Sequence, residues 1–254
     1  MINIEQLLPV AIFAADEACK EILEVYNTGD FQAEVKSDNS PLTIADRRAH
    51  TKIAAILGET GLPVLSEEGS VIPYTVRKQW EYFWMVDPLD GTKEFVKRNG
   101  EFTVNIALIK GCVPVLGVVA IPVTGELYYG GVGIGCFLRM NGKEVKLDNR
   151  VSADLNRPGI RVVASRSHMS GETKDFIDKL KSPTILSSGS SIKFMLVASG
   201  KADVYPRFAP TMEWDTAASH AIVNGVGLRV LRIDNDQEIS YNKEDLLNPS
   251  FICR

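Results

Sequence analysis

Two aspartates, Asp87 and Asp90, lie three residues apart directly after an apolar, strand-like run. A buried strand that stops at Asp87 places a carboxylate at a sheet edge, and a turn through Pro88 lets Asp90 converge on the same point. Gly91 and Thr92 follow and predict a helix start, whose unpaired N–H groups favour an anion. Metal and phosphate ligands are thus adjacent, which indicates metal-assisted phosphoryl chemistry.

Two further acids, Glu67 and Asp215, stand at the ends of apolar segments. Glu67 follows the short apolar run 63–66, and Asp215 lies where a helix of small residues begins. Mg²⁺ takes oxygen ligands and keeps several waters, so these carboxylates can together hold two or three ions. The carbonyl of Leu89, between the two aspartates, is the natural extra ligand. The three histidines are isolated in the sequence, so no cluster of nitrogen or sulfur ligands favours a softer metal.

Each of these acids also has a plain structural interpretation. Asp-Pro and Asp-Gly are common turn dipeptides, so Asp87 to Gly91 alone could be only a sharp turn. Glu67 and Glu68 are typical of a solvated loop, and Asp215 suits the dipole at a helix start. The combination of acids, each closing or opening an apolar segment, favours a metal site.

Composition narrows the class of protein. The 254 residues are 45% hydrophobic and 24% charged, as in ordinary globular proteins, and a net charge of −4 argues against a nucleic-acid polymer as partner. The four cysteines are scattered and predict free thiols in a reducing compartment. The N-terminus resembles no signal peptide, and no apolar run approaches the ~20 residues that span a bilayer. We therefore expect a cytoplasmic protein; peripheral contact with the inner face of the cell membrane stays open, as does the choice between monomer and homodimer.

Hydrophobic periodicity divides the chain into two halves. Residues 1–150 predict long helices over 4–25 and 43–57, and strands over 31–36, 63–66, 103–109, 113–121, 126–129 and 136–140. Residues 151–254 alternate strands (161–164, 183–186, 202–205, 227–231) with helices (171–180, 190–198, 214–224), which favours a layered α/β half. No flexible linker separates the halves, so residues 1–254 are expected to form one unit. The glycine-rich stretch 130–135 lies between two strands and predicts a hairpin rather than a cofactor loop.

Three motifs carry a resemblance to a known family. Ser66-Glu67-Glu68, Asp87-Pro88-Leu89-Asp90-Gly91-Thr92 and Trp214-Asp215-Thr216-Ala217-Ala218 resemble, in order and spacing, those of the lithium-sensitive, Mg²⁺-dependent inositol monophosphatase superfamily. Within it the chain is most similar to the CysQ-type 3'(2'),5'-bisphosphate nucleotidase branch. The stretches that point there are 93–95, 98–105, 165–168, 189–194 and 205–207; an inositol phosphatase would be expected to carry Thr-Asn in place of Lys93-Glu94.

The resemblance implies an αβαβα sandwich and assigns roles to the acids. Glu67, Asp87 and the Leu89 carbonyl would hold one Mg²⁺; Asp87, Asp90 and Asp215 would hold a second; a third, weaker ion would lie near Glu67. The catalytic set would be Asp46, Thr92 and Glu67, with Asp46 pairing with Thr92 to help take the proton from the attacking water. The set in contact with substrate would be Glu67, Leu89, Asp90, Gly91, Thr92, His168, Gly189, Ser190, Lys193, Arg207 and Asp215.

The implied substrate is a small nucleotide, adenosine 3',5'-bisphosphate, which would yield AMP and phosphate in sulfur assimilation; the 3'-phosphorylated sulfate ester is a second expected substrate. Lys193 and Arg207 would bind the 5'-phosphate, although the residues by themselves favour solvated charges on a helix and a strand end. Gly189 and Ser190 would open a helix and offer N–H groups, and His168 would pack near the adenosine. The alternatives are an inositol or sugar phosphatase on the same scaffold and, from another class, a non-catalytic sensor of the bisphosphate.

Overall fold

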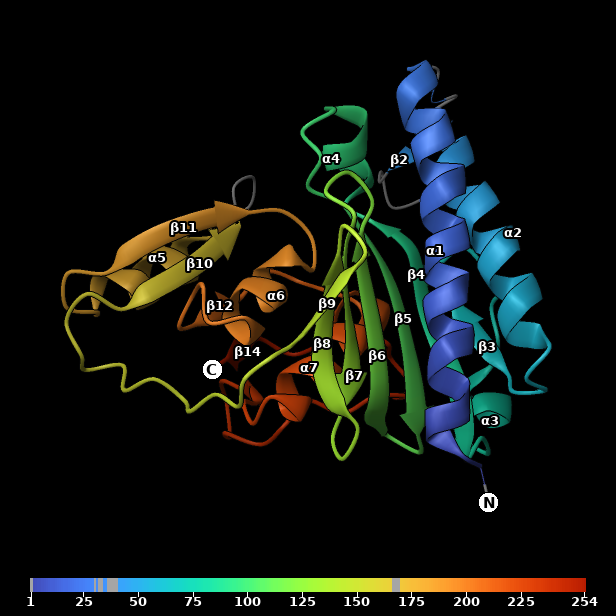
Figure 1. Cartoon of the computed structure of the whole chain (residues 1–254). Coiled ribbons are helices and arrows are strands. Elements are labelled where there is room, and N and C mark those ends of the chain that lie inside the picture. Colours follow the sequence, from blue (N-terminus) through green and yellow to red (C-terminus); the bar gives the residue numbers. More distant parts are fainter. Residues whose placement is uncertain (1, 30, 32–33, 36–40, 166–169) are drawn as a thin grey trace.

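A seven-stranded sheet forms the centre of the first half of the molecule (Figure 1). The computed structural model describes residues 2–29, 31, 34–35, 41–165 and 170–254. In spatial order the strands are β3 (Val64–Ser66), β4 (Tyr82–Asp90), β5 (Thr103–Lys110), β6 (Val113–Ile121), β7 (Glu126–Gly131), β8 (Gly135–Met140) and β9 (Lys143–Lys146). Strand β3 is parallel to β4, and every later pair is antiparallel. The glycine-rich stretch is the hairpin between β7 and β8, as predicted.

Two long helices, α1 (Ile4–Thr28) and α2 (Ile44–Gly58), cover one face of this sheet (Figure 1). Helix α1 buries one stripe of alanines with Ile22 and Val25, the periodicity that predicted it. It begins at Ile4, so Pro9 lies inside the helix and does not mark its start. Helix α2 is capped at Thr43, whose backbone N–H donates to the Asp46 carboxylate in a capping box. This cap fixes one of the predicted catalytic residues.

Helix α7 (Glu213–Gly225) crosses the opposite face of the sheet at very close range. A Cβ on Gly117 of β6 would lie 2.0 Å from the Ala218 carbonyl oxygen, and one on Gly225 would lie 2.3 Å from Cys136 Sγ. Only glycine allows backbones this near one another. Since Asp215 is in the first turn of α7, these contacts set its position relative to the sheet.

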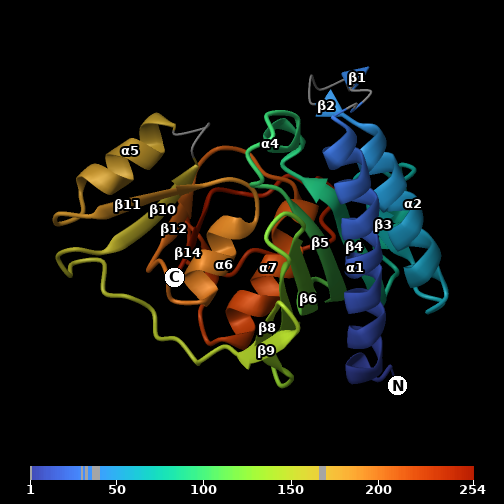
Figure 2. The same cartoon turned by 45° about the horizontal axis from the view of Figure 1, so that its top comes forward.

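The second half adds a further sheet layer (Figure 2). Strand β10 (Arg161–Ser165) is parallel to β11 (Thr184–Ser188), and β12 (Tyr205–Arg207) pairs with β14 (Phe251–Cys253), which pairs with β13 (Val230–Arg232). A bridge from Val162 to Val204 joins the two groups. Helices α6 (Ile192–Ala198) and α7 lie between the sheets, and α5 (Gly171–Asp178) lies outside (Figure 2). The layers are αβαβα, as expected.

One large hydrophobic cluster joins the halves: Phe83, Ile109 and Val119 of the first sheet pack with buried residues such as Phe194, Ala217 and Val230. This shared core suits the predicted single unit, which a thermal transition would test. The four cysteines are free thiols. Among the described residues, no helix combines the length and apolarity needed to cross a membrane.

Several elements differ from the sequence prediction. Strand β4 does not stop at Asp87 but continues to Asp90, because Asp87 pairs with Asn105 and Asp90 pairs with Thr103 on either side of an irregularity. Within the strand expected over 31–36 the structure shows β1 (Glu34–Val35), paired with β2 (Pro41–Leu42); residues 32–33 and 36–40 lie outside the described residues. The helix expected from residue 190 begins at Ile192, because Ser190 has a φ of 45°. The short elements α3 (Tyr74–Arg77), α4 (Thr92–Val96), β9 and β14 had not been assigned from the sequence, although a helix start at Gly91-Thr92 was expected.

Candidate active site

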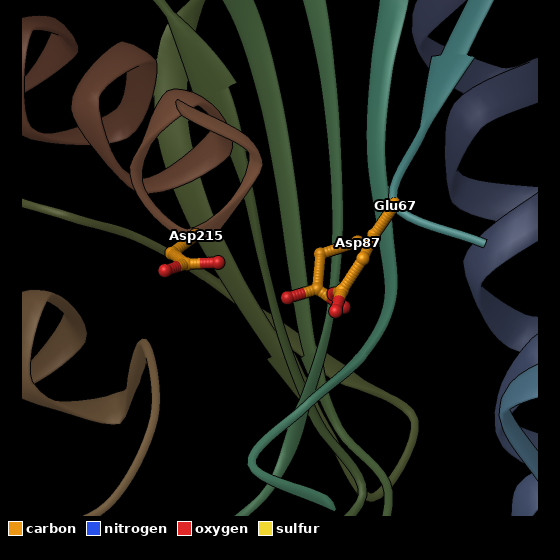
Figure 3. Close-up of side chains that lie close together, drawn as sticks. All are labelled: Glu67, Asp87 and Asp215. Carbon is orange, nitrogen blue, oxygen red and sulfur yellow. The ribbon is translucent and has the colours of Figure 1, made fainter. Parts of the chain in front are cut away.

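Three of the predicted metal-binding acids meet at one point of the structure (Figure 3). Glu67 follows the end of β3, Asp87 lies in β4, and Asp215 is in the first turn of α7. One carboxylate oxygen from each lies within 4.8 Å of those of the other two. Glu67 and Asp87 approach from the sheet and Asp215 from the opposite side (Figure 3). Residues distant in sequence thus form one cluster of carboxylate oxygen atoms.

The electrostatics of this cluster fit a divalent cation. Burial raises the pKa of Asp87 well above its usual range, and the neighbouring Glu67, Asp90 and Asp215 carboxylates raise it further. The pKa of Asp215 is also raised well above its usual range, first by burial and then by the Asp90 and Glu67 carboxylates. Buried carboxylates repel one another unless a positive charge lies between them. An all-oxygen donor set of this kind matches the ligands that Mg²⁺ prefers.

A β-bulge brings the two aspartates of β4 to one face. Asp87 pairs with Asn105 and Asp90 with Thr103, so three steps along β4 oppose two steps along β5. In a regular strand, residues three apart point to opposite faces. The extra residue of the bulge restores a common face for Asp87 and Asp90. The register thus returns Asp90 to the face of Asp87, and a bulge rather than a strand end does so. Asp90 is not among the three acids whose oxygens lie within 4.8 Å of one another, although its carboxylate raises the pKa of Asp87.

The predicted pairing of Asp46 with Thr92 is present as a hydrogen bond. The Thr92 hydroxyl lies 3.1 Å from Asp46 Oδ1 and 3.3 Å from the Leu89 carbonyl oxygen. The other Asp46 oxygen accepts bonds from the backbone N–H and the hydroxyl of Thr43. Burial raises the pKa of Asp46, and the Thr43 bonds oppose that rise. The Leu89 N–H donates to Asp87 Oδ1 at 3.0 Å, which fixes the loop that carries the expected carbonyl ligand.

Gly91 and Ser190 join the two halves beside the acids. Gly91 has a φ of 95°, and a Cβ there would lie 2.1 Å from Ser190 Oγ. That hydroxyl lies 2.8 Å from the carbonyl oxygens of both Asp90 and Glu101. A Cβ on Gly189 would lie 2.7 Å from the same Glu101 oxygen. Gly189 and Ser190 therefore precede α6 and pack on the loop after Asp90, rather than opening the helix as expected.

A cavity of about 160 Å³ is lined by both acids and cations. Asp90 and Asp215 line it, as do Lys193, Arg207 and Tyr205. Lys193 is 5% exposed and donates to the Ser190 carbonyl; burial lowers its pKa to about 8, although Asp90 favours the charged form. Two guanidinium nitrogens of Arg207 donate to the carbonyls of residues 209 and 210, which fixes its direction. Lys193 is therefore not a solvated surface charge.

Comparison with known proteins agrees with this geometry. A model of the Inositol monophosphatase family matches residues 3–254. The chain belongs to the inositol monophosphatase family. Members of this family are metal-dependent, in accord with the acidic cluster.

Two relatives resemble the chain over nearly its whole length. The 3'(2'),5'-bisphosphate nucleotidase CysQ of Escherichia coli K12 is 43% identical over 240 residues, which are 93% of this chain and 95% of the relative. The crystal structure of CysQ from Bacteroides thetaiotaomicron is 50% identical with a TM-score of 0.84, covering 96% of this chain and 95% of that one. Inositol monophosphatase-II of Staphylococcus aureus, at 20% identity and a TM-score of 0.75 over 96% of this chain and 86% of that one, shares the fold.

Two polar residues of the site had no role assigned from the sequence. Asn105 and Ser191 are each 1% exposed and are hydrogen-bonded to each other, Asn105 Nδ2 lying 3.0 Å from Ser191 Oγ. A polar amide inside the apolar run of β5 was the available signal, since buried polar groups need partners. His168, the expected adenosine neighbour, lies outside the described residues.

Proposed function

We propose that this chain is a Mg²⁺-dependent phosphatase that removes the 3'-phosphate of adenosine 3',5'-bisphosphate, giving AMP and inorganic phosphate. The observation that carries the proposal is one cavity lined both by two of the proposed metal-binding acids, Asp90 and Asp215, and by Lys193 and Arg207. A bisphosphate needs a metal centre at one phosphate and fixed cations at the other. At about 160 Å³ the cavity suits the phosphates and part of the ribose, while the base would lie outside it. The full-length likeness to bisphosphate nucleotidases supports the same substrate.

The acids would hold two or three Mg²⁺ ions. Glu67, Asp87 and the Leu89 carbonyl would bind the first ion; Asp87, Asp90 and Asp215 would bind the second; a third, weaker ion would lie near Glu67. Bound there, the ions would lower the pKa of a coordinated water and stabilise charge on the phosphate. The backbone N–H groups of Gly91 and Thr92 would orient the phosphate oxygens.

Thr92 and Asp46 would manage the proton of the attacking water. The Thr92 hydroxyl can accept that proton while its own proton moves to Asp46 Oδ1, to which it is already hydrogen-bonded. The raised pKa of Asp46 makes this carboxylate a better proton acceptor than an ordinary aspartate. Glu67 would act in the same step by binding the water's metal ion.

Regiochemistry and substrate comparison test the proposal. Phosphate release is measured from adenosine 3',5'-bisphosphate, its 3'-phosphorylated sulfate ester and inositol 1-phosphate, with Mg²⁺ and then with added Li⁺. We expect AMP as the nucleotide product and inhibition by Li⁺. Equal or greater activity on inositol 1-phosphate would establish the inositol phosphatase alternative, and binding of the bisphosphate without turnover would establish a sensor.

The role of Lys193 is tested by a pair of substrates. Lys193→Gln should raise the KM for adenosine 3',5'-bisphosphate roughly 10- to 100-fold, the effect of losing a hydrogen bond to a charged group. The KM for 3'-AMP, which has no 5'-phosphate, should change much less. Lys201→Gln, at an exposed lysine just after α6, is the matched control. Equal effects on both substrates would remove Lys193 from the 5'-phosphate site.

Location and assembly complete the proposal. Free thiols suit a reducing compartment, so we propose a cytoplasmic protein. Cell fractionation distinguishes this from peripheral attachment to the inner membrane face, and sedimentation distinguishes a monomer from a homodimer.

A further inference from the structure

Ser191 lies between two of the proposed metal-binding acids, Asp90 and Asp215, and contacts both of these residues. Its hydroxyl oxygen is 3.1 Å from Asp90 Oδ2 and 2.9 Å from the Asp215 carbonyl oxygen. Asp90 belongs to β4, and Asp215 to the first turn of α7. Ser191 itself immediately precedes α6 and is 1% exposed. This single hydroxyl therefore connects the strand and the helix that carry two of the proposed metal ligands.

Hydrogen bonds also connect Ser191 to β5. Asn105 Nδ2 donates to Ser191 Oγ, and the Thr103 hydroxyl lies 3.2 Å from Asn105 Oδ1 and 3.5 Å from Asp90 Oδ2. Ser191 then accepts from Asn105, and its only proton is left for Asp90 and the Asp215 carbonyl. A network that satisfies each member in this way holds its side chains rigidly.

The same serine contacts the Asp90 carboxylate directly, with its hydroxyl oxygen 3.1 Å from Asp90 Oδ2. Ser190 meanwhile binds the Asp90 backbone carbonyl at 2.8 Å. Adjacent serines thus hold both the main chain and the side chain of Asp90. Groups that orient metal ligands in this manner affect metal affinity without touching the ion.

We propose that Ser191 and Asn105 are positioning residues that fix the Asp90 carboxylate relative to the start of α7, so that Asp90 and Asp215 can bind the same cation. This inference rests on the metal site of the proposed function. It does not depend on the identity of the phosphorylated substrate. Neither residue needs to contact the substrate for the effect.

Direct metal binding provides the test. Binding of Mn²⁺ to the full-length protein, without substrate, is measured by calorimetry or by the paramagnetic signal of the free ion. Ser191→Ala should weaken binding about 10-fold, the lower end of what loss of a ligand's supporting partner produces. The Mg²⁺ concentration for half-maximal activity should rise by a similar factor, with kcat at saturating Mg²⁺ changed much less.

Ser219→Ala is the matched control. Ser219 is equally buried at 1% exposed, lies on α7, and its hydroxyl has no hydrogen-bond partner among the described residues. Its removal should leave Mn²⁺ binding unchanged. Asn105→Asp is the second variant, because it keeps the shape but replaces a donor with an acceptor and turns the Ser191 proton away from Asp90. It should also weaken Mn²⁺ binding.

The outcomes separate this inference from the proposed function. Wild-type Mn²⁺ affinity in Ser191→Ala, or in Asn105→Asp where Ser191→Ala does not fold, would overturn it even if the enzyme hydrolyses the bisphosphate. An equal loss in Ser219→Ala would overturn it as well, since any buried hydroxyl would then suffice. Conversely, weaker Mn²⁺ binding in a protein that hydrolyses no nucleotide would uphold the positioning role and refute the substrate.

Discussion

Replacement of Gly117 by alanine should disturb the metal site from a distance. A Cβ there would lie 2.0 Å from the Ala218 carbonyl oxygen of α7, whereas ordinary contact begins at 3.4 Å. The two backbones must therefore separate by the difference, about 1.4 Å, and Asp215 lies three residues before Ala218 on the same helix. Overpacking of this kind costs about 1–3 kcal/mol of unfolding free energy. For a chain of this size that is a fall in Tm of roughly 2–12 °C.

The effect on metal binding distinguishes this displacement from simple destabilisation. A ligand misplaced by about 1 Å can reduce activity on the order of 100-fold, so we expect Mn²⁺ affinity to fall roughly 10- to 100-fold. Thermal unfolding by circular dichroism and Mn²⁺ titration measure the two effects in one preparation. Gly58→Ala is the control, because nothing lies within 4 Å of a Cβ there and the residue ends a helix. If Gly117→Ala matches Gly58→Ala in both assays, the close packing of α7 does not set the site.

Three further substitutions have defined outcomes. Asp87→Asn should leave the Tm of the metal-free protein unchanged or higher, because it relieves repulsion in the acidic cluster, and added Mg²⁺ should raise that Tm less than in wild type. Asp90→Asn should abolish phosphate release while the fold survives in circular dichroism; near-wild-type activity at saturating Mg²⁺ would contradict the metal account. Asp203→Asn should lower stability by roughly 1–2 kcal/mol at pH 7, because the bond from Arg161 lowers the pKa of Asp203 to about 2. A carboxyl whose pKa is lower in the folded than in the unfolded state stabilises the fold at pH values above its unfolded pKa. In urea unfolding, the stability difference between wild type and Asp203→Asn should therefore vanish as the pH falls from about 4 toward 2.

The sequence predicted the acids of the site better than the geometry that unites them. Glu67, Asp87 and Asp215 were identifiable because each closes or opens an apolar segment, and the structure places them within 4.8 Å. The bulge between Asp87 and Asp90 was not predictable, since it is a mismatch between two strands and neither strand shows it alone. Ser191 was missed for a similar reason, because its partners come from β4, β5 and α7.

Long elements with a strong periodicity were predicted well, and short ones were not. The stripe of alanines specified α1, and the alternation of β5 to β8 specified an antiparallel sheet. Strand β14 contains only three residues and exists because it fits between β12 and β13. Gly117 falls within the strand predicted over 113–121. Its close contact with helix α7 could not be predicted, because it depends on Ala218, about a hundred residues later. Tertiary contact, not local propensity, decides such features.

Contacts between the two halves determine how the acids are arranged. Three contacts join residues from opposite halves of the chain: Gly117 with Ala218, Gly91 with Ser190, and Ser191 with Asp90. The second and third of these contacts adjoin Asp90, and the first positions the helix that carries Asp215. The carboxylates of the site repel one another in the absence of a cation. The packing must therefore hold together groups that electrostatics would separate. It follows that metal binding and the packing of the two halves are linked. A change that loosens the interface between the halves should weaken metal binding, and bound metal should in turn stabilise that interface.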